Sequence, residues 1–562
     1  MRQEADDQVY GILDHVTASV TGTEKHYRIG RREDTLRRRT EREYAEMRAQ
    51  GIEPPPIRMN LVEALEIAAE NSREFQRQKE SLYRVGLNLT RTQFDFSLQW
   101  FGGSSEGVDG VSDDSASATI SNDLSASINT TAGTRVVSSF VNTFFRDLVR
   151  SDNWNGSSVL NLSITQPLLR ASRRRIVREP LTQSERDVVY AVRSFERFRE
   201  TLAVNVVSDY LRVLQRQQNL ESVRNNLESV QKQEALTQAL FDNHRRAITD
   251  LDRASQSVLQ AENNLANSIN ALQQSLDSFK LTLGLTVDTP IELDPAVFDI
   301  IEELGILPVD LTMDEAIDLA LQRRYDYRTI CDQVDDAARQ LLIAEDGLRS
   351  FLDLSAAVQI PTDPGQPLDF DFSQIAWSAG FDLDLALAIL PQRNVYRSQL
   401  ISLDNAIRTR EEFEDQVKFQ IRNELRDISN LIRNYEIAKK GVELNARRVD
   451  STTKLYEFGR APALDVLDAQ NDLLGAELNL TAAVVDYAIA RLQLLRDLEA
   501  IRLDEKGLTI ELDAPLPTGP QNTEDTQRFL LRRQTPRSWE TDQPWQELLQ
   551  DFAGTESKPE GS

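Results

Sequence analysis

Three carboxylates in the last fifth of the chain are spaced so that they can act together. Asp465, Asp468 and Asp472 stand at positions i, i+3 and i+7, which share one face if the segment is a helix. Acidic residues near a helix N-terminus favour its dipole by about 0.3–1 kcal/mol each, but the effect fades within one turn and explains Asp472 poorly. Several copies of the same face around one axis would concentrate negative charge and attract cations. The spacing therefore indicates either helix-starting residues or a cation-selective ring.

The other reactive residue types form no catalytic pattern. The sequence has one cysteine, Cys331, and its three histidines, His15, His26 and His244, are scattered, so neither a cysteine-cluster metal site nor an intrachain disulfide is expected. We find no nucleophile motif, no acid and base in a pocket-like context and no phosphate-binding glycine loop. We therefore expect no enzymatic activity and no cofactor.

Charge and hydropathy exclude two further classes of protein. The chain carries 64 Lys plus Arg against 90 Asp plus Glu, and its net charge of −26 opposes binding to nucleic acid. No run of residues approaches the roughly 20 apolar residues that a membrane-spanning helix needs, which excludes a helical membrane protein. The first residues lack the apolar core of a secretory signal. Taken alone, they favour the cytoplasm.

An internal duplication organises the elements that must position these carboxylates. Residues 61–69 match residues 313–321, and each copy opens with the residue types of a capping box, Asn60 with Glu63 and Thr312 with Glu315. Residues 250–265 match residues 465–480, and each copy closes on the phrase Ile-Glu-Leu-Asp, at residues 291–294 and 510–513. The predicted unit is a helix, a variable middle, a very long helix, a tight turn, a helix and a short strand.

The long helices have the strongest periodicity in the sequence. Apolar residues recur at helical spacing in two stripes: Val206, Tyr210, Val213, Leu220, Val223, Leu227 and Val230 in the first copy, and Val417, Ile421, Leu425, Ile428, Ile432, Tyr435 and Val442 in the second. The first helix is predicted from a capping box at Thr182 and Glu185 to about Asn243, and the second from Arg393 to about Glu457. Each would be on the order of 90–100 Å long. Such stripes require helical partners.

The middles of both copies alternate apolar and polar residues with the period of a β-strand. In the first copy the apolar positions are Phe94, Phe96, Leu98, Trp100, Leu160, Leu162 and Ile164, and in the second they are Leu354, Ala356, Val358, Ile360, Trp377, Ala379, Phe381 and Leu383. This pattern is typical of a strand between lipid and an aqueous lumen, and also of a soluble sandwich. Four strands cannot close a barrel in lipid, whereas three copies would supply twelve, so the strands favour a trimer. We expect Trp377, Phe381 and Leu383 to face lipid and Ser378, Asp382 and Asp384 to face water.

These patterns divide the chain into four regions. We expect a charged, solvated helical arm at 1–58 on the outside of the trimer, a first repeat at 59–310, a second repeat at 311–513 and a disordered tail at 514–562. The first repeat would hold a β-hairpin at about 94–167, a helical hairpin at 182–284 and a strand at 291–293. The second would hold them at 351–387, 393–500 and 509–512. The polar stretch 102–156 is expected to be an outer loop, with an added strand at 118–129, and residues 136–145 to be a plug or a lipid-facing patch.

Residues 455–470, which read Leu-Tyr-Glu-Phe-Gly-Arg-Ala-Pro-Ala-Leu-Asp-Val-Leu-Asp-Ala-Gln, resemble the second inter-helix turn of TolC-like outer-membrane efflux proteins. Residues 247–254 resemble the first turn of that family, and residues 165–170, Thr-Gln-Pro-Leu-Leu-Arg, are similar to the phrase with which these proteins leave the barrel for the tunnel. The resemblance covers roughly residues 59–513. It implies a mainly α homotrimer with a 12-stranded transmembrane β-barrel in outer-membrane lipid and a long coiled-coil tunnel in the periplasm. Because that location conflicts with the start of the chain, we expect a signal segment that was removed or lies upstream of Met1.

The same resemblance implies partners and site residues. The partners would be an inner-membrane transporter and a periplasmic adaptor that contacts the turns at Gly459, Ala247 and Ala463. Asp465 and Asp468 would form an entrance ring with Asp472 as a weaker member, and Tyr456 and Asp250 would hold the closed tip together. The first turn has His244 at the position where the second turn has Gly459, so we expect the first turn to differ in shape. The arginine that helps to latch the second turn in the family would fall on Ala461, and Arg460 lies one residue earlier.

One alternative from another class remains open. A periplasmic adaptor or coiled-coil scaffold without a barrel would also carry long helical stripes. An adaptor usually has one helical hairpin between two halves of a small β domain, whereas this chain has two hairpins, each preceded by an alternating insertion.

Overall fold

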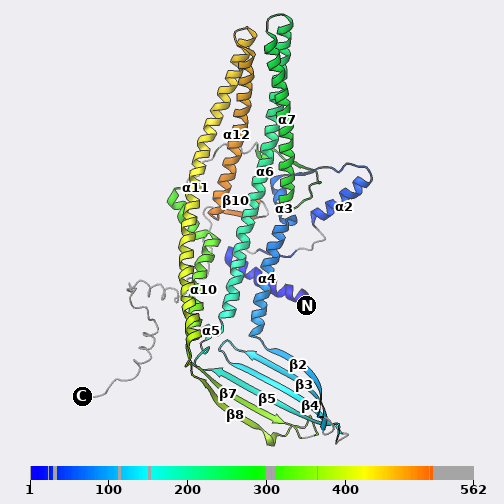
Figure 1. Ribbon diagram of the computed structural model, residues 1–562, viewed down its shortest axis with the longest axis vertical. Helices are drawn as coiled ribbons and strands as arrows, with labels where there is room; N and C mark the ends of the chain where they lie inside the picture. The colour runs from blue at the N-terminus through cyan, green and yellow to red at the C-terminus, as the bar shows by residue number, and fades with distance from the viewer. Residues whose placement is uncertain are drawn as a thin grey trace, which may run out of the picture.

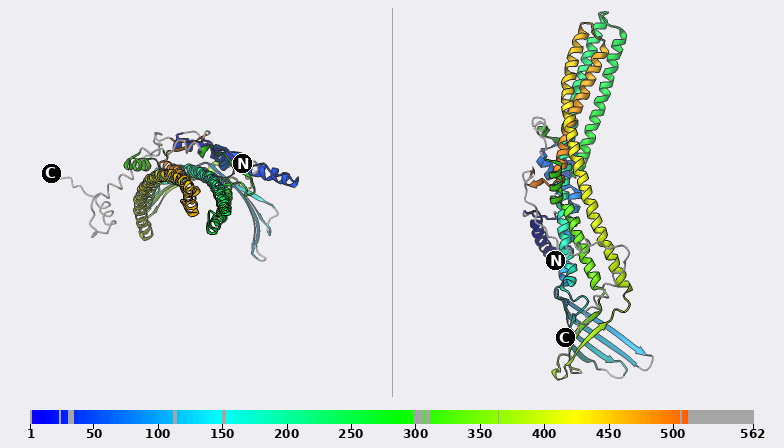
Figure 2. Two further views of the ribbon diagram at one scale, coloured as in Figure 1. Left: turned by 90° about the horizontal axis from the view of Figure 1, so that it is seen from above. Right: turned by 90° about the vertical axis from the view of Figure 1, so that its left-hand side faces the viewer.

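The computed structural model describes residues 2–22, 25–29, 35–111, 115–149, 153–298, 306, 311–363, 365–504 and 507–510. The predicted tail at 514–562 lies outside these residues. Four long helices form one end of the elongated molecule and a β-sheet forms the other (Figure 1). Viewed from above, the helices follow an arc with a concave and a convex side, and the sheet continues the same curve (Figure 2).

The chain passes twice through the same order of elements. The N-terminal elements are α1 (Arg2–Thr21), α2 (Leu36–Ala49) and β1 (Ile57–Met59). The first pass contains α3 (Leu61–Asn71), α4 (Arg73–Asp95), β2 (Gln99–Val111), β3 (Ser115–Asn129), β4 (Arg135–Asp147), β5 (Asn155–Pro167), α5 (Arg174–Val177), α6 (Glu179–Asp242), α7 (Ile248–Thr282) and β6 (Ile291–Leu293). The second contains α9 (Met313–Arg323), α10 (Tyr325–Asp346), β7 (Phe351–Pro361), the 3₁₀ turn η1 (Phe372–Gln374), β8 (Ala376–Asp384), α11 (Leu390–Glu457), α12 (Ala463–Asp497), β9 (Ile501–Asp504) and β10 (Gly507–Ile510).

Both predicted capping boxes at the start of the passes are present, at Asn60 and at Thr312. The predicted box at Thr182 is wrong, because α6 begins earlier, at Glu179, with Pro180 in its first turn. A proline there needs no hydrogen-bond partner for its nitrogen and already has a helical φ, so it starts the helix without a side-chain cap. In the same way α11 begins at Leu390 with Pro391.

The two long helices contain 64 and 68 residues, which corresponds to about 96 and 102 Å. The parts of the apolar stripes nearer the sheet are buried as predicted. Val206, Tyr210 and Val213 of α6 lie in one core with Val485 and Ile489 of α12, and Val417 and Ile421 of α11 lie in a second core with Tyr487 and Leu494 of α12. Among the described residues one helix, α12, is long and apolar enough to cross a membrane by length and composition alone, which corrects the statement that no such run exists. The apolar residues in the second half of α12, among them Val485, Ile489 and Leu494, lie in these two helical cores.

The sheet differs most from the prediction, because it has six strands instead of four. Within the described residues it is antiparallel throughout, in the order β2-β3-β4-β5-β7-β8. The stretch at 102–156 is therefore not an outer loop, because it supplies most of β2 and all of β3 and β4. The added strand expected at 118–129 is present as part of β3, and residues 136–145, expected to be a plug or a lipid-facing patch, are part of β4. Phe94 belongs to the end of α4, and the first strand begins at Gln99.

The two faces of the sheet have different compositions. Trp377, Val358 and Leu162 are register partners across β8, β7 and β5 and share one face, as do Phe381 and Leu354. The opposite face carries mostly small polar and acidic residues: Ser378, Asp382, Asp384, Ser355, Asp353, Ser163, Ser139 and Ser125. The predicted separation of Trp377, Phe381 and Leu383 from Ser378, Asp382 and Asp384 is present.

Short strands brace the middle of the molecule. β6 has the predicted bounds and pairs in parallel with β1, so residues 57–58 belong to this unit and not to the N-terminal arm. The buried Tyr210 hydroxyl donates to the carbonyl of Asp294 at 2.8 Å and so links α6 to the end of β6. In the second pass β10 (507–510) begins two residues before the predicted strand 509–512 and pairs with β9, while residues 511 and 512 lie outside the described residues.

The N-terminal arm packs against the tunnel helices. α1 and α2 lie on the convex side of the arc (Figure 2). Val9 and Leu13 of α1 are buried in one cluster with Leu82 of α4 and Val188 of α6. The arm is therefore helical as predicted, but α1 is half buried instead of solvated on all sides.

Candidate functional site

The two turns at the helical tip have the same backbone geometry. His244 has φ +55° and Gly459 has φ +74°. In the first turn the amides of His244 and Arg245 donate to the carbonyls of Phe241 and Leu240, both at 2.8 Å; in the second, Gly459 and Arg460 donate at the corresponding spacing. Both are Schellman-type helix ends. The expectation that His244 gives the first turn another shape is therefore wrong.

Tyr456 joins the two hairpins at this tip. Its side chain is fully buried in a cluster with Ala463 and Val466, against Leu236 and Leu240 of α6. The Thr237 hydroxyl donates to the carbonyl of Gln233 at 2.8 Å, so the Tyr456 hydroxyl donates to Thr237, also at 2.8 Å. The tyrosine of the predicted latch is present, but its hydroxyl bonds Thr237 and not Asp250.

Arg246 provides the second connection between the turns. Its Nη2 donates to the carbonyls of Tyr456 and Ala461, at 3.0 and 2.9 Å, and its guanidinium lies 4.3 Å from the centre of the Tyr456 ring. Asp250, one helical turn further along, contacts the same guanidinium at 4.0 Å. Asp250 therefore makes only a weak contact with this connection, and the first turn places the Arg246 guanidinium at the Ala461 carbonyl, where the second turn has no arginine.

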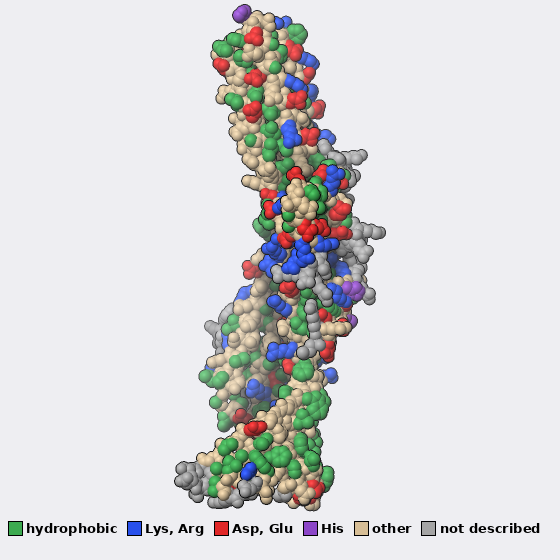
Figure 3. Space-filling view, turned by 90° about the vertical axis from the view of Figure 1, so that its right-hand side faces the viewer, with side chains coloured by type: hydrophobic (Ala, Val, Ile, Leu, Met, Phe, Trp, Pro, Cys, Tyr) green, Lys and Arg blue, Asp and Glu red, His purple; other side chains and the backbone are tan. Residues whose placement is uncertain are grey.

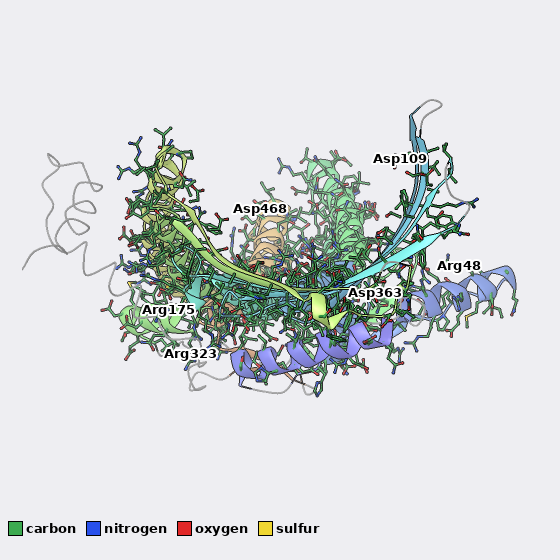
Figure 4. The ribbon with its side chains drawn as sticks, turned by 90° about the horizontal axis from the view of Figure 1, so that it is seen from below. Arg48, Asp109, Arg175, Arg323, Asp363 and Asp468 are labelled. Atoms are coloured by element: carbon green, nitrogen blue, oxygen red, sulfur yellow. The ribbon has the colours of Figure 1, made fainter. Side chains whose placement is uncertain are left out.

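The three carboxylates lie on the exposed face of α12, as their spacing predicts. Val466, Leu467 and Ala469 are buried between them. Asp472 forms an ion pair with Arg448 of α11, which partly neutralises it. Figure 4, which looks along the helices from the sheet end, shows Asp468 on the concave side of the arc and Arg323 on the opposite side.

The remaining predicted tip residues differ in exposure. Gly459, Arg460 and Ala247 are exposed, so a partner can reach them. Ala463 is fully buried beside Tyr456, so the structure does not support its predicted contact with an adaptor. The most exposed large apolar side chains at the tip are those of Phe458, with 76% of its surface exposed, and Ile248, with 51%; Leu455 and Leu464 are exposed to a lesser extent.

A second charged cluster lies buried between α6, α11 and the end of α12. On the surface, Figure 3 shows Lys and Arg side chains gathered at mid-height, above the more apolar surface of the sheet end. Arg197 of α6 contacts Asp497 and Glu499, both at 2.8 Å, and Gln420 of α11 donates to Asp497 at 2.7 Å and to Glu424 at 3.0 Å. Burial, and then the neighbouring Asp497, raises the pKa of Glu424 to about 8. Burial opposes ionisation of Asp497, but the hydrogen bond from Arg496 leads the contacts that lower its pKa to about 2.

Sequence reasoning missed Arg246, Thr237 and this mid-height cluster. No local pattern reveals them, since each contact joins segments that are distant in the chain. The described residues contain no group of three or more His, Cys, Asp or Glu that could hold a metal ion.

Known proteins share part of this sequence and the fold. Residues 120–285 match the family described as outer membrane efflux protein. The chain resembles the outer-membrane protein VceC from Vibrio cholerae, with 17% identity, a TM-score of 0.59 and coverage of 78% of this chain and 95% of that one. It also resembles the CmeC outer-membrane channel of Campylobacter jejuni, with 12% identity, a TM-score of 0.57 and coverage of 85% and 90%. The open-state MtrE outer-membrane channel of Neisseria gonorrhoeae is similar as well, with 13% identity, a TM-score of 0.55 and coverage of 78% and 88%.

No curated protein sequence matches the chain. The fold is that of outer-membrane channels with a helical tunnel and an antiparallel sheet. The family match, together with this fold, confirms the resemblance to the TolC-like outer-membrane efflux family. The matched family and these neighbours are outer-membrane proteins, which agrees with the expected outer-membrane location and with the expectation that the chain is not an enzyme.

Proposed function

We propose that three copies of this chain form a duct that conducts solutes from an inner-membrane transporter to the outside. The observation that carries this proposal is the curved shape of the chain, which has a concave and a convex side (Figure 2). In addition, the two edge strands of the sheet, β2 and β8, are exposed. An open sheet edge in lipid leaves backbone groups without partners at several kcal/mol each. Neighbouring copies would remove these edges and close the tunnel.

The faces of the sheet support its placement in the membrane. Strands β7 and β8 contain 11 and 9 residues, close to the about 9–11 that a tilted membrane strand needs. The apolar face with Trp377 and Phe381 would contact lipid, and the face with Asp382 would line the lumen. A soluble adaptor or coiled-coil scaffold, the competing function, has no use for exposed aromatic residues on a sheet of this length.

The tip is the proposed gate. Asp465 and Asp468 of three copies would surround the axis as a cation-selective ring, and Arg246 with Tyr456 would hold the hairpins of each copy in the closed position. The exposed turns at Gly459 and Ala247, with Phe458 and Ile248 beside them, are the proposed docking surface for the periplasmic adaptor.

Block of the pore by a multivalent cation tests this assignment. In planar bilayers, Asp465→Ala combined with Asp468→Ala should abolish the block and leave the assembled trimer intact. Asp472→Ala is the matched control: because Arg448 already neutralises this carboxylate in part, its removal should weaken the block less. Persistence of the block in the double variant would show that the carboxylates only start the helix.

A further inference from the structure

The number of strands changes the barrel that three copies can build. β2 and β8 are the two edges of the six-stranded sheet. Every residue of β8 is exposed, and so are residues 100–110 of β2, whereas most residues of the central strands β4 and β5 are partly covered. The free hydrogen-bonding edges therefore belong to β2 and β8, and not to β4.

Strands β3 and β4, which raise the number of strands from the predicted four to six, are held by contacts at the end of the sheet that meets the helices. The turn 130–134 between β3 and β4 lies against the exit of β5: the Thr134 hydroxyl bonds the Gln166 amide oxygen, and Gln166 Nε2 donates to the Ala132 carbonyl at 3.4 Å. Gly133 has φ +85°, and a side chain there would approach Pro167 and the Ala171 carbonyl to 3.1 Å. β3 is also paired to β4 along thirteen residue pairs, from Ser117 to Asn129. The β3–β4 hairpin is therefore a part of the barrel wall and not a loose surface loop.

The directions of the edges allow closure. The six strands alternate in direction, so β2 runs away from the helices and β8 runs back toward them. A β2 edge placed beside a β8 edge is consequently antiparallel, like every other pair in the sheet. β2 has 13 residues and β8 has 9, so both are long enough to span a membrane.

We propose that β2 of one copy pairs with β8 of the next, so that three copies close a barrel of eighteen strands. This inference rests on the trimer of the proposed function and specifies its contact surface. With strands about 4.8 Å apart and tilted by about 40°, eighteen strands give a diameter of about 36 Å, against about 24 Å for twelve.

The lumen of this barrel is wide and open. The face opposite Trp377 carries small side chains at Gly103, Ser125, Ser139 and Ser378, which do not fill a cylinder of this width. Barrels of 16–18 strands leave an aqueous channel. The barrel therefore does not limit the size of the exported solute, and the narrowest point is the helical tip.

Disulfide cross-linking between neighbouring copies tests the pairing. In a Cys331→Ser background, cysteines are introduced at Phe101, Gly103 or Ser105 of β2, each combined with Ser378, Gly380 or Asp382 of β8. All six positions share the polar face, so one register brings a pair together. Matched controls carry cysteines at Val137, Ser139 or Val141 of β4 with the same β8 partners.

We expect covalent trimers from one register of the β2 and β8 pairs and none from the β4 and β8 pairs, together with a ring of about 36 Å in electron-microscopic end views. Trimers that cross-link through β4 and β8, or that cross-link through neither, would overturn the eighteen-stranded barrel and leave the trimeric channel standing. A monomer by light scattering in detergent would refute the trimer itself, and the barrel with it.

Discussion

Replacing Arg246 by alanine should loosen the closed tip. The Arg246 side chain is 14% exposed, and its guanidinium donates to two main-chain carbonyls of the second turn, at Tyr456 and Ala461, while it covers the Tyr456 ring. No other side chain of the first turn makes such contacts with the second turn among the described residues. The variant therefore leaves both carbonyls without these partners and separates the α6–α7 turn from the α11–α12 turn.

The size of the effect follows from these contacts. Each charge-assisted hydrogen bond contributes about 1.5–3 kcal/mol and the contact with the ring about 0.5–2 kcal/mol. The ion pair to Asp250, at 4.0 Å, adds little. Because water can replace part of the lost bonding at the end of the molecule, we expect about 3 kcal/mol. That corresponds to a roughly 100-fold rise in the population of the open tip.

Amide hydrogen exchange measures this opening directly. Protection of residues 236–250 and 455–470 should fall by roughly 100-fold in Arg246→Ala, with no change in the sheet. Arg245→Ala is the matched control, since the Arg245 side chain is exposed and the residue contributes its backbone amide to the turn. Equal exchange at the tip in the two variants would refute the role assigned to Arg246.

Three further changes have defined outcomes. Tyr456→Phe removes the bond to Thr237, worth about 1 kcal/mol, so resting conductance in planar bilayers should rise about fivefold, and an unchanged conductance would exclude this latch. Phe381→Arg should reduce assembled trimer on native gels, at a cost of about 2–4 kcal/mol, whereas Asp382→Arg should not; the reverse order would mean that the faces are exchanged. The folded-state pKa of Glu424, about 8, exceeds its usual value, so its proton stabilises the fold at low pH and this stabilisation is lost as pH rises toward 8. Thermal unfolding should show up to about 1.4 kcal/mol of lost stability per pH unit between about pH 5 and pH 8 and no further loss from this group above that range, and Glu424→Gln should flatten the slope if the residue is responsible.

The elements with a strong period could be predicted from the sequence. Val206, Tyr210 and Val213 defined the buried stripe of α6, and the capping residues Asn60 and Thr312 gave the starts of α3 and α9. Period and capping are local properties, so they do not depend on what the rest of the chain does.

Strand β4 was not recognised, and β3 was predicted only as an added strand at 118–129 within a loop, because the residues facing water in this sheet are the ones that usually form loops. Ser117, Ser121 and Ser125 alternate with Ala118 and other apolar residues, but the many serine, asparagine and aspartate residues concealed this alternation. His244 was misleading for the opposite reason: its side chain suggested a different turn, although the backbone pays the small cost of a positive φ there.

The contacts that hold the tip could not be predicted, since they join positions far apart in the chain. Arg246 and Ala461 are 215 residues apart, and Thr237 and Tyr456 are 219 apart. The sequence does identify Tyr456, Asp465 and Asp468 as candidates, but only packing of the two hairpins shows that Arg246 bridges them.

The central claim is that this chain forms a trimeric pore, and single-channel recording of the purified protein in a planar bilayer tests it most directly. Protein taken from the trimer fraction in mild detergent should insert and give a cation-preferring conductance, because Asp382 and the other carboxylates of the polar face would line the lumen of the proposed barrel. A stable monomer that produces no conductance at any protein concentration would contradict the account.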